Sequence, residues 1–189
     1  MAHNSIVLLL GFPGTGKLTI ARALAPLIGA KIVDNHWINN PIFGLIEPDG
    51  KTPLPETVWD RTNEVQHAVM ETIATLAKPM ANFIFTYYGV EDEPYDTKSY
   101  ELMRDTAQRR GALFVPVRLL CSELEMRKRI ISSERKENFK TINPDGVGKY
   151  QRQTLLNPSH PNQLTLDVSA LAPTESAAAI AAHVLKLGT

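Results

Sequence analysis

The stretch from Gly11 to Thr19 reads GFPGTGKLT and contains residue types that bind phosphate. Gly11, Gly16 and Lys17 fit the spacing glycine, four residues, glycine, lysine. Glycines allow the backbone to curl around phosphate oxygens with its N–H groups inward, and the lysine adds a mobile cation. We therefore predict a phosphate loop made of Gly11, Phe12, Pro13, Gly14, Thr15, Gly16, Lys17, Leu18 and Thr19.

The segments on either side of this loop suit that chemistry. Residues 5–10, SIVLLL, are an apolar run typical of a buried parallel strand, and residues 16–28 have helical spacing of apolar residues. A helix that begins at the loop directs its partial positive charge at a bound phosphate. The alternative is a glycine-rich turn without a ligand, and the strand–loop–helix context favours phosphate binding.

Asp34 is a second candidate for chemistry. It follows a short predicted strand, 30–33, and ligands of open α/β sheets bind beyond the carboxyl ends of strands. We expect Asp34 to position or deprotonate a hydroxyl group of a second molecule that accepts a phosphate group, here called the acceptor. The alternative chemistry is to hold Mg²⁺ through a water molecule. A turn or N-cap role is the alternative. A further strand, 82–87, ends in Thr86 and Tyr87, which we expect on the acceptor side.

Strands and helices alternate along the chain, which predicts a parallel sheet with helices on both faces. The segment 41–56 is rich in proline and glycine and is predicted to be a loop. The later elements are expected at 55–78 (helix), 82–87 (strand), 94–110 (helix), 113–120 (strand), 122–130 (helix), 164–168 (strand) and 177–187 (helix, capped by Thr174). The helix over 55–78 should bury Val58, Val65, Val69, Ile73 and Leu76.

Two basic features could bind anions. Arg61 lies off the apolar stripe of the predicted helix 55–78, where an acceptor contact and a solvated charge are equally open. A basic cluster precedes a polar segment, 137–148, and could be a solvated face. A phosphate site elsewhere in the chain favours a lid that closes over it. The cluster comprises Arg127, Lys128, Arg129, Arg135 and Lys136.

The bulk composition restricts the partners. The chain of 189 residues suits one domain, and its 20 basic and 20 acidic side chains give no net charge to attract nucleic acid or a membrane surface. The one cysteine, Cys121, suits a reducing compartment, and no apolar run reaches the length of a membrane span. We expect a cytoplasmic monomer or homodimer.

Together these features resemble the P-loop nucleoside-monophosphate-kinase superfamily. The closest resemblance is to small bacterial kinases of the shikimate- and adenylate-kinase type, including uncharacterised AAA family ATPases. It rests on the phosphate loop, Asp34, the helix after Cys121, the basic segment and the sequence 166–173, LDVSALAP. The resemblance implies a three-layer αβα P-loop fold with a five-stranded parallel sheet in the order 2-3-1-4-5. It also implies one domain over 1–189, with an acceptor-binding insert at about 37–80 and a lid at about 130–150.

The resemblance also implies roles for individual residues. Arg129 is similar to the arginine that packs on adenine, Pro173 to the adenine-side loop, Arg135 to a catalytic lid cation and Arg61 to an acceptor-binding arginine. ATP and Mg²⁺ are the implied cofactors. Leu18 stands where most such loops carry a hydroxyl that ligates Mg²⁺. The resemblance to adenylate kinases then implies that nucleotide and water hold the metal.

The sequence therefore predicts transfer of the γ-phosphate of ATP to a small-molecule acceptor. Arg61 would favour an acidic acceptor, of the nucleoside-monophosphate or hydroxy-acid type. The acidic turn 91–93 would favour an amine, or is a solvated loop. The alternatives are a nucleotide-binding ATPase without an acceptor and a nucleic-acid end kinase, and the neutral composition disfavours the latter.

Overall fold

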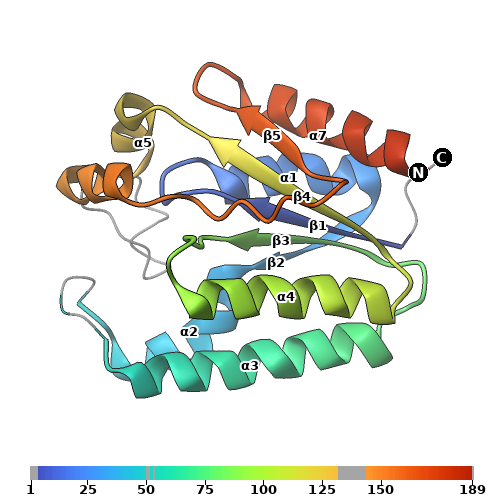
Figure 1. Cartoon of the computed structure of the whole chain (residues 1–189), viewed down its shortest axis with the longest axis horizontal. Helices are drawn as coiled ribbons and strands as arrows, with labels where there is room; N and C mark the ends of the chain where they lie inside the picture. The colour runs from blue at the N-terminus through green and yellow to red at the C-terminus, as the bar shows by residue number, and fades with distance from the viewer. Residues whose placement is uncertain (1–3, 50–51, 53, 132–143, 189) are drawn as a thin grey trace.

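The computed structural model describes residues 4–49, 52, 54–131 and 144–188. Within them, five parallel strands form one sheet in the order β2-β3-β1-β4-β5, and helices cover both of its faces (Figure 1). The predicted fold class and strand order are confirmed. The strands are β1 (Ser5–Leu10), β2 (Ala30–Asp34), β3 (Asn82–Tyr87), β4 (Leu113–Leu120) and β5 (Leu164–Asp167).

The helices are described by their bounds in chain order. They are α1 (Lys17–Ile28), α2 (Asn35–Ile46), α3 (Glu56–Thr75), α4 (Pro94–Arg109), α5 (Glu123–Arg129), the 3₁₀ helix η1 (Pro144–Arg152) and α7 (Pro173–Leu187). In Figure 1, α1 and α7 lie on one face of the sheet, and α3 and α4 lie on the other. No described helix has both the length and the apolar character needed to cross a membrane.

The central strand β1 is buried along its whole length, as its apolar sequence predicts. Alternate side chains of a strand point to opposite faces, so β1 contributes to two cores. Val7 and Leu9 pack with residues of α1 and α7, whereas Ile6 and Leu8 pack with residues of α3 and α4. The strand that leads into the phosphate loop is therefore packed against helices on both of its faces.

The sheet register brings the predicted site residues to one edge. Asp34 is in register with Thr86 on β3, and Leu10, the last residue of β1, is in register with Tyr87. The carboxyl ends of β1, β2 and β3 are therefore level, and the phosphate loop follows β1 directly.

The predicted loop over 41–56 is wrong for residues 41–46, because α2 continues to Ile46. Pro41 lies inside this helix, where it removes one backbone hydrogen bond. Ile38 and Phe43 of the same helix are buried, and this packing offsets the loss. Local proline and glycine signals favoured a loop, but burial of an apolar face decided the structure.

The predicted apolar stripe of α3 is also wrong in part. Ile73 is buried and Val65 and Val69 pack against the core, but Leu76 is 79% exposed. The helix instead turns the polar side chains of Thr62 and Gln66 inward. They face a cavity rather than the apolar core, which explains why hydrophobic periodicity missed them.

The last helix differs from the prediction at its N-terminal end. The last helix begins at Pro173 rather than at Ala177, and its N-cap is Ala172, not Thr174. The Glu175 carboxylate accepts a hydrogen bond from the Ala172 N–H at 2.7 Å and stabilises this end. Arg135 and Lys136, with most of the predicted lid, lie outside the described residues.

Candidate functional site

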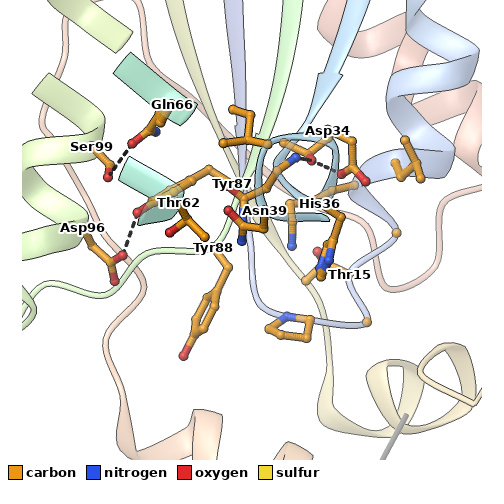
Figure 2. Close-up of a pocket in the computed structure, with 18 of the residues that line it drawn as sticks. Thr15, Asp34, His36, Asn39, Thr62, Gln66, Tyr87, Tyr88, Asp96 and Ser99 are labelled. Atoms are coloured by element: carbon orange, nitrogen blue, oxygen red, sulfur yellow. Dashed lines mark hydrogen bonds between the residues drawn. The ribbon is translucent and has the colours of Figure 1, made fainter. Parts of the chain in front are cut away.

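A cavity of about 1030 Å³ lies at the carboxyl edge of the sheet, where α/β folds bind ligands. The phosphate loop lines one end, the start of α2 lines the middle, and α3 and α4 line the other end (Figure 2). It brings together the following sequence-predicted residues: Pro13, Gly14, Thr15, Gly16, Lys17, Leu18, Thr19, Asp34, Thr86, Tyr87, Arg129 and Pro173.

The conformation of the phosphate loop depends on glycine at two positions. Gly14 and Gly16 have φ angles of 95° and 88°, in the left-handed region that disfavours other residues. A Cβ atom on Gly14 would also lie 2.9 Å from the carbonyl oxygen of Met126. Gly16 is the N-cap of α1, which has neither a side-chain cap nor an acidic residue in its first turn. The N-terminal N–H groups of α1 thus suit an anion.

The Lys17 ammonium lies across the loop. Its Nζ donates hydrogen bonds to the carbonyl oxygens of Gly11 at 2.6 Å and Phe12 at 3.0 Å. The Thr15 hydroxyl donates to the same Phe12 oxygen at 2.9 Å. Hydrogen bonds from the Lys17 and Thr15 side chains to backbone carbonyls therefore stabilise the loop. Gly11 and Phe12 lie behind this surface and do not line the cavity.

Arg129 links the phosphate loop to the segment between β5 and α7. Its Nη1 donates to the Thr15 carbonyl at 3.4 Å, and its Nη2 donates to the carbonyls of Val168 and Ser169 at 3.1 and 3.2 Å. Glu125 lies 3.5 Å from its Nε. A guanidinium fixed on three sides forms one wall of the cavity beside the loop, and Pro173 lines the same cavity.

An aromatic cluster behind the loop was not predicted from the sequence. The Phe12 ring contacts those of Tyr150 and Tyr88, with centroid distances of 5.2 and 5.7 Å. The three rings pack on a small core formed by α5 and η1, which includes Met126 and Ile130. Phe12 occupies a variable position of the loop pattern, so its spacing gave no signal of this contact.

Asp34 is oriented by its neighbour on the next strand. The Thr86 hydroxyl donates a hydrogen bond to Asp34 Oδ1 and accepts one from the Asn35 N–H at 3.2 Å. Thr86 is itself buried. The position of the carboxylate is therefore set by β3 as well as by β2, which makes Thr86 a positioning residue.

Tyr87 points away from Asp34, toward α4 (Figure 2). Its hydroxyl donates to Asp96 Oδ1 at 2.7 Å, and the Val90 N–H donates to Asp96 Oδ2 at 2.9 Å. Burial raises the pKa of the Asp96 carboxyl and raises that of the Tyr87 phenol well above its ordinary value. This pair fixes the turn between β3 and α4 at the wall of the cavity.

The far end of the cavity contains polar residues that sequence reasoning missed. Thr62, Gln66 and Ser99 are buried there, and His36 and Asn39 of α2 lie between them and the loop (Figure 2). Polar residues at inward positions of α3 and α4 were the available signal. Without the fold, such positions cannot be told from an ordinary solvated face.

Arg61 is not among the residues that line the cavity. It forms an ion pair with Glu64, and both side chains are 63% exposed. The hydrogen bond with Glu64 raises the pKa of the guanidinium. Sequence reasoning placed Arg61 beside the acceptor, whereas the structure turns it toward its own helix surface.

Solved structures of small kinases have the same fold. A gluconokinase from Sinorhizobium meliloti matches with a TM-score of 0.66 at 16% identity, over 98% of this chain and 94% of that one. A shikimate kinase from Acinetobacter baumannii in complex with shikimate matches with 0.54 at 18%, over 97% and 94%. An APS kinase from Mycobacterium tuberculosis in complex with AMPPNP and APS matches with 0.59 at 13%, over 98% and 99%.

These likenesses show that the chain has the same fold as these kinases, which is the fold that the sequence resemblance implied. No family model and no curated protein matches the sequence. Any narrower conclusion about function therefore rests on the geometry of the site.

Proposed function

We propose that this protein transfers the γ-phosphoryl group of ATP to a hydroxyl group of a small-molecule acceptor. The observation that carries the proposal is one continuous cavity that runs from the phosphate loop, past Asp34, to buried polar residues of α3 and α4. Phosphoryl transfer needs donor and acceptor held side by side in a shared space. The kinases of the same fold, one of them in complex with AMPPNP, support ATP as the donor.

The nucleotide would occupy the loop end of the cavity. The amides of the loop and of the first turn of α1 would bind phosphate oxygens, and Lys17 would neutralise charge on the outer phosphates. Arg129 and Pro173 would border the base. The sequence resemblance alone supports a role for Arg135 as a lid cation that neutralises phosphate charge.

The residues present fit Mg²⁺ bound largely through nucleotide and water. Asp34 supplies one carboxylate at the site, and Leu18 replaces the usual hydroxyl ligand. Among the described residues, no three His, Cys, Asp or Glu side chains converge as a metal site. Mg²⁺ typically keeps several waters and uses one or two carboxylates with substrate phosphates. When bound, it would neutralise charge on the phosphates.

Asp34 would act on the acceptor. Its carboxylate would accept the proton of the acceptor hydroxyl while the hydroxyl oxygen bonds to the γ-phosphorus. The bond from that phosphorus to the bridging oxygen breaks, and ADP leaves with the electron pair. Thr86, by holding Asp34, would set the direction of this proton transfer.

The acidic acceptor expected from the sequence depended on Arg61. Because Arg61 pairs with Glu64 outside the cavity, that geometry gives no support to a nucleoside monophosphate or a hydroxy acid. Phosphotransfer to a hydroxyl group does not depend on this point, since Asp34 and the loop are unaffected by it.

The proposal is tested by ADP release with and without a panel of hydroxyl-bearing metabolites. We expect an acceptor-dependent rise in ADP and a matching phosphorylated product in mass spectra. Lys17→Ala should abolish both, whereas Lys31→Ala, on the exposed side of β2, should change neither. ADP release that no acceptor stimulates would indicate an ATPase and reject the proposal.

A further inference from the structure

The end of the cavity remote from the phosphate loop has an excess of negative charge. Among the described lining residues, the lysine and arginine side chains are Lys17 and Arg129, and both lie beside the loop. Among the described lining residues, the charged side chains at the far end are carboxylates. These carboxylates are Glu56, Asp60, Glu93 and Asp96.

A largely buried side-chain amide at the same end has one hydrogen-bonding group open to the cavity. Gln66 is 6% exposed and Ser99 is 3% exposed, and the Ser99 hydroxyl donates to Gln66 Oε1 at 3.2 Å. No described group accepts a hydrogen bond from Gln66 Nε2, although the residue lines the cavity. Gln66 Nε2 is thus an N–H donor that opens into the cavity from a residue otherwise held by the fold, and it suits a ligand oxygen.

An aromatic surface borders this polar end. Tyr95 donates its hydroxyl hydrogen to the Trp59 carbonyl at 2.8 Å, and the Trp59 ring packs edge-on against Phe43 at a centroid distance of 6.0 Å. Trp59, Tyr95 and Phe43 all line the cavity. Aromatic faces beside carboxylates attract ammonium groups, through the ring quadrupole as well as through charge.

We propose that the acceptor is a polyhydroxylated amine of the amino-sugar class, a proposal that rests on the phosphotransferase function above. Gln66 and Ser99 bind hydroxyl oxygens at the buried end of the cavity. The ammonium group lies near Trp59 and the exposed carboxylates of Glu56 and Asp60. An anionic acceptor would face repulsion from these groups, and a neutral sugar would leave them unused.

The test compares three sugars that differ in charge: glucosamine, glucose and glucuronate. Calorimetric binding is measured in the presence of AMPPNP and Mg²⁺, so that it does not depend on turnover. Glucosamine should bind about tenfold more tightly than glucose, with glucuronate weakest. Glucuronate binding tightest, or glucosamine binding no better than glucose, would overturn the inference.

Variants test separately the contribution of the Gln66 hydrogen bonds and that of the carboxylate charge to acceptor binding. Gln66→Met should weaken glucosamine and glucose alike by about tenfold, and leave AMPPNP binding unchanged. The double variant Glu56→Gln/Asp60→Asn should remove most of the preference for glucosamine and spare glucose. Glu64→Gln is the matched control, since Glu64 is on the same helix but outside the cavity. A preference that survives the double variant would contradict the charge argument.

Failure of this inference differs from failure of the phosphotransferase function. Phosphorylation of glucuronate but not of glucosamine would support phosphotransfer and reject the amine. Tight binding of glucosamine with AMPPNP, without any phosphorylated product, would support the amine and reject phosphotransfer. If Gln66→Met lowers the thermal stability sharply, Ser99→Ala provides a second test of the same hydrogen-bonded pair.

Discussion

The ring of Phe12 stacks on the ring of Tyr150 at a centroid distance of 5.2 Å, with their planes inclined by 19°. One ring belongs to the phosphate loop and the other to η1, which lies far later in the chain. Tyr88, after β3, contacts both rings. The back of the phosphate loop is thus held by side chains, while its front faces the cavity with backbone amides.

Removal of this aromatic contact should loosen the loop. Phe12→Ala should weaken ATP binding several-fold and lower the free energy of unfolding by about 1–3 kcal/mol, because the half-buried ring loses apolar contacts. Calorimetry and urea unfolding measure the two effects. Leu124→Ala is the control, since Leu124 is exposed on the adjacent α5. Unchanged ATP affinity in Phe12→Ala would show that the loop holds its shape without the ring.

Asp34→Asn should remove turnover and leave ATP affinity within a few-fold, because the amide cannot accept the proton of the acceptor hydroxyl. Thr86→Val should lower kcat less than this, since it releases the carboxylate without removing it. Steady-state kinetics and nucleotide titration measure both. Full activity in Asp34→Asn would show that the carboxylate serves only the turn.

Arg129→Ala should raise the KM for ATP more than it lowers kcat, because the guanidinium connects the loop to the segment beside Pro173. Arg129→Lys should recover little, since a single ammonium cannot bridge three carbonyls. Lys128→Ala is the adjacent control, an exposed residue paired with Glu125. Equal KM values for ATP in Arg129→Ala and Lys128→Ala would contradict a nucleotide contact.

Substitution of two apolar residues, one in α3 and one just after it, should change the stability by different amounts. Met70 is fully buried, so Met70→Ala should lower the free energy of unfolding by about 2–5 kcal/mol. Leu76 is exposed just after the helix, so Leu76→Ala should lower the free energy of unfolding by less than about 0.5 kcal/mol. Denaturant unfolding of the two variants checks the orientation of α3 directly, and a larger loss for Leu76→Ala would contradict it.

The single cysteine should react slowly. Burial raises the pKa of the Cys121 thiol, an effect that outweighs the opposing charge of Arg129. Alkylation requires the thiolate, and a raised pKa leaves less thiolate at any given pH near neutrality. The pH midpoint of iodoacetamide labelling should therefore lie above that of the same protein in urea. A midpoint at or below the urea value would contradict this environment.

The phosphate end of the site could be predicted from the sequence because its signals are local. The spacing from Gly11 to Lys17 and the apolar run before it define a strand, a loop and a helix without reference to other segments. The position of Asp34 followed from one rule about strand ends. The sheet order came from the family resemblance, and the structure confirms it.

The acceptor end could not be predicted, because it depends on how helices rotate against the sheet. Gln66 and Ser99 are buried by the approach of α3 to α4, which no local pattern reports. Arg61 illustrates the converse error. A basic residue near the start of α3 could face the cavity or the solvent, and its neighbour Glu64, one turn along, holds it outside.

Helices α2 and α3 form one uninterrupted length of chain between β2 and β3, and the phosphate loop and Arg129 lie outside it. Under the proposed function, this segment provides much of the acceptor end of the cavity together with Ser99 of α4, whereas Lys17 and Arg129 precede and follow it in the chain. On that proposal, exchange of residues 35–81 alone should change the selectivity for the acceptor and leave nucleotide binding in place.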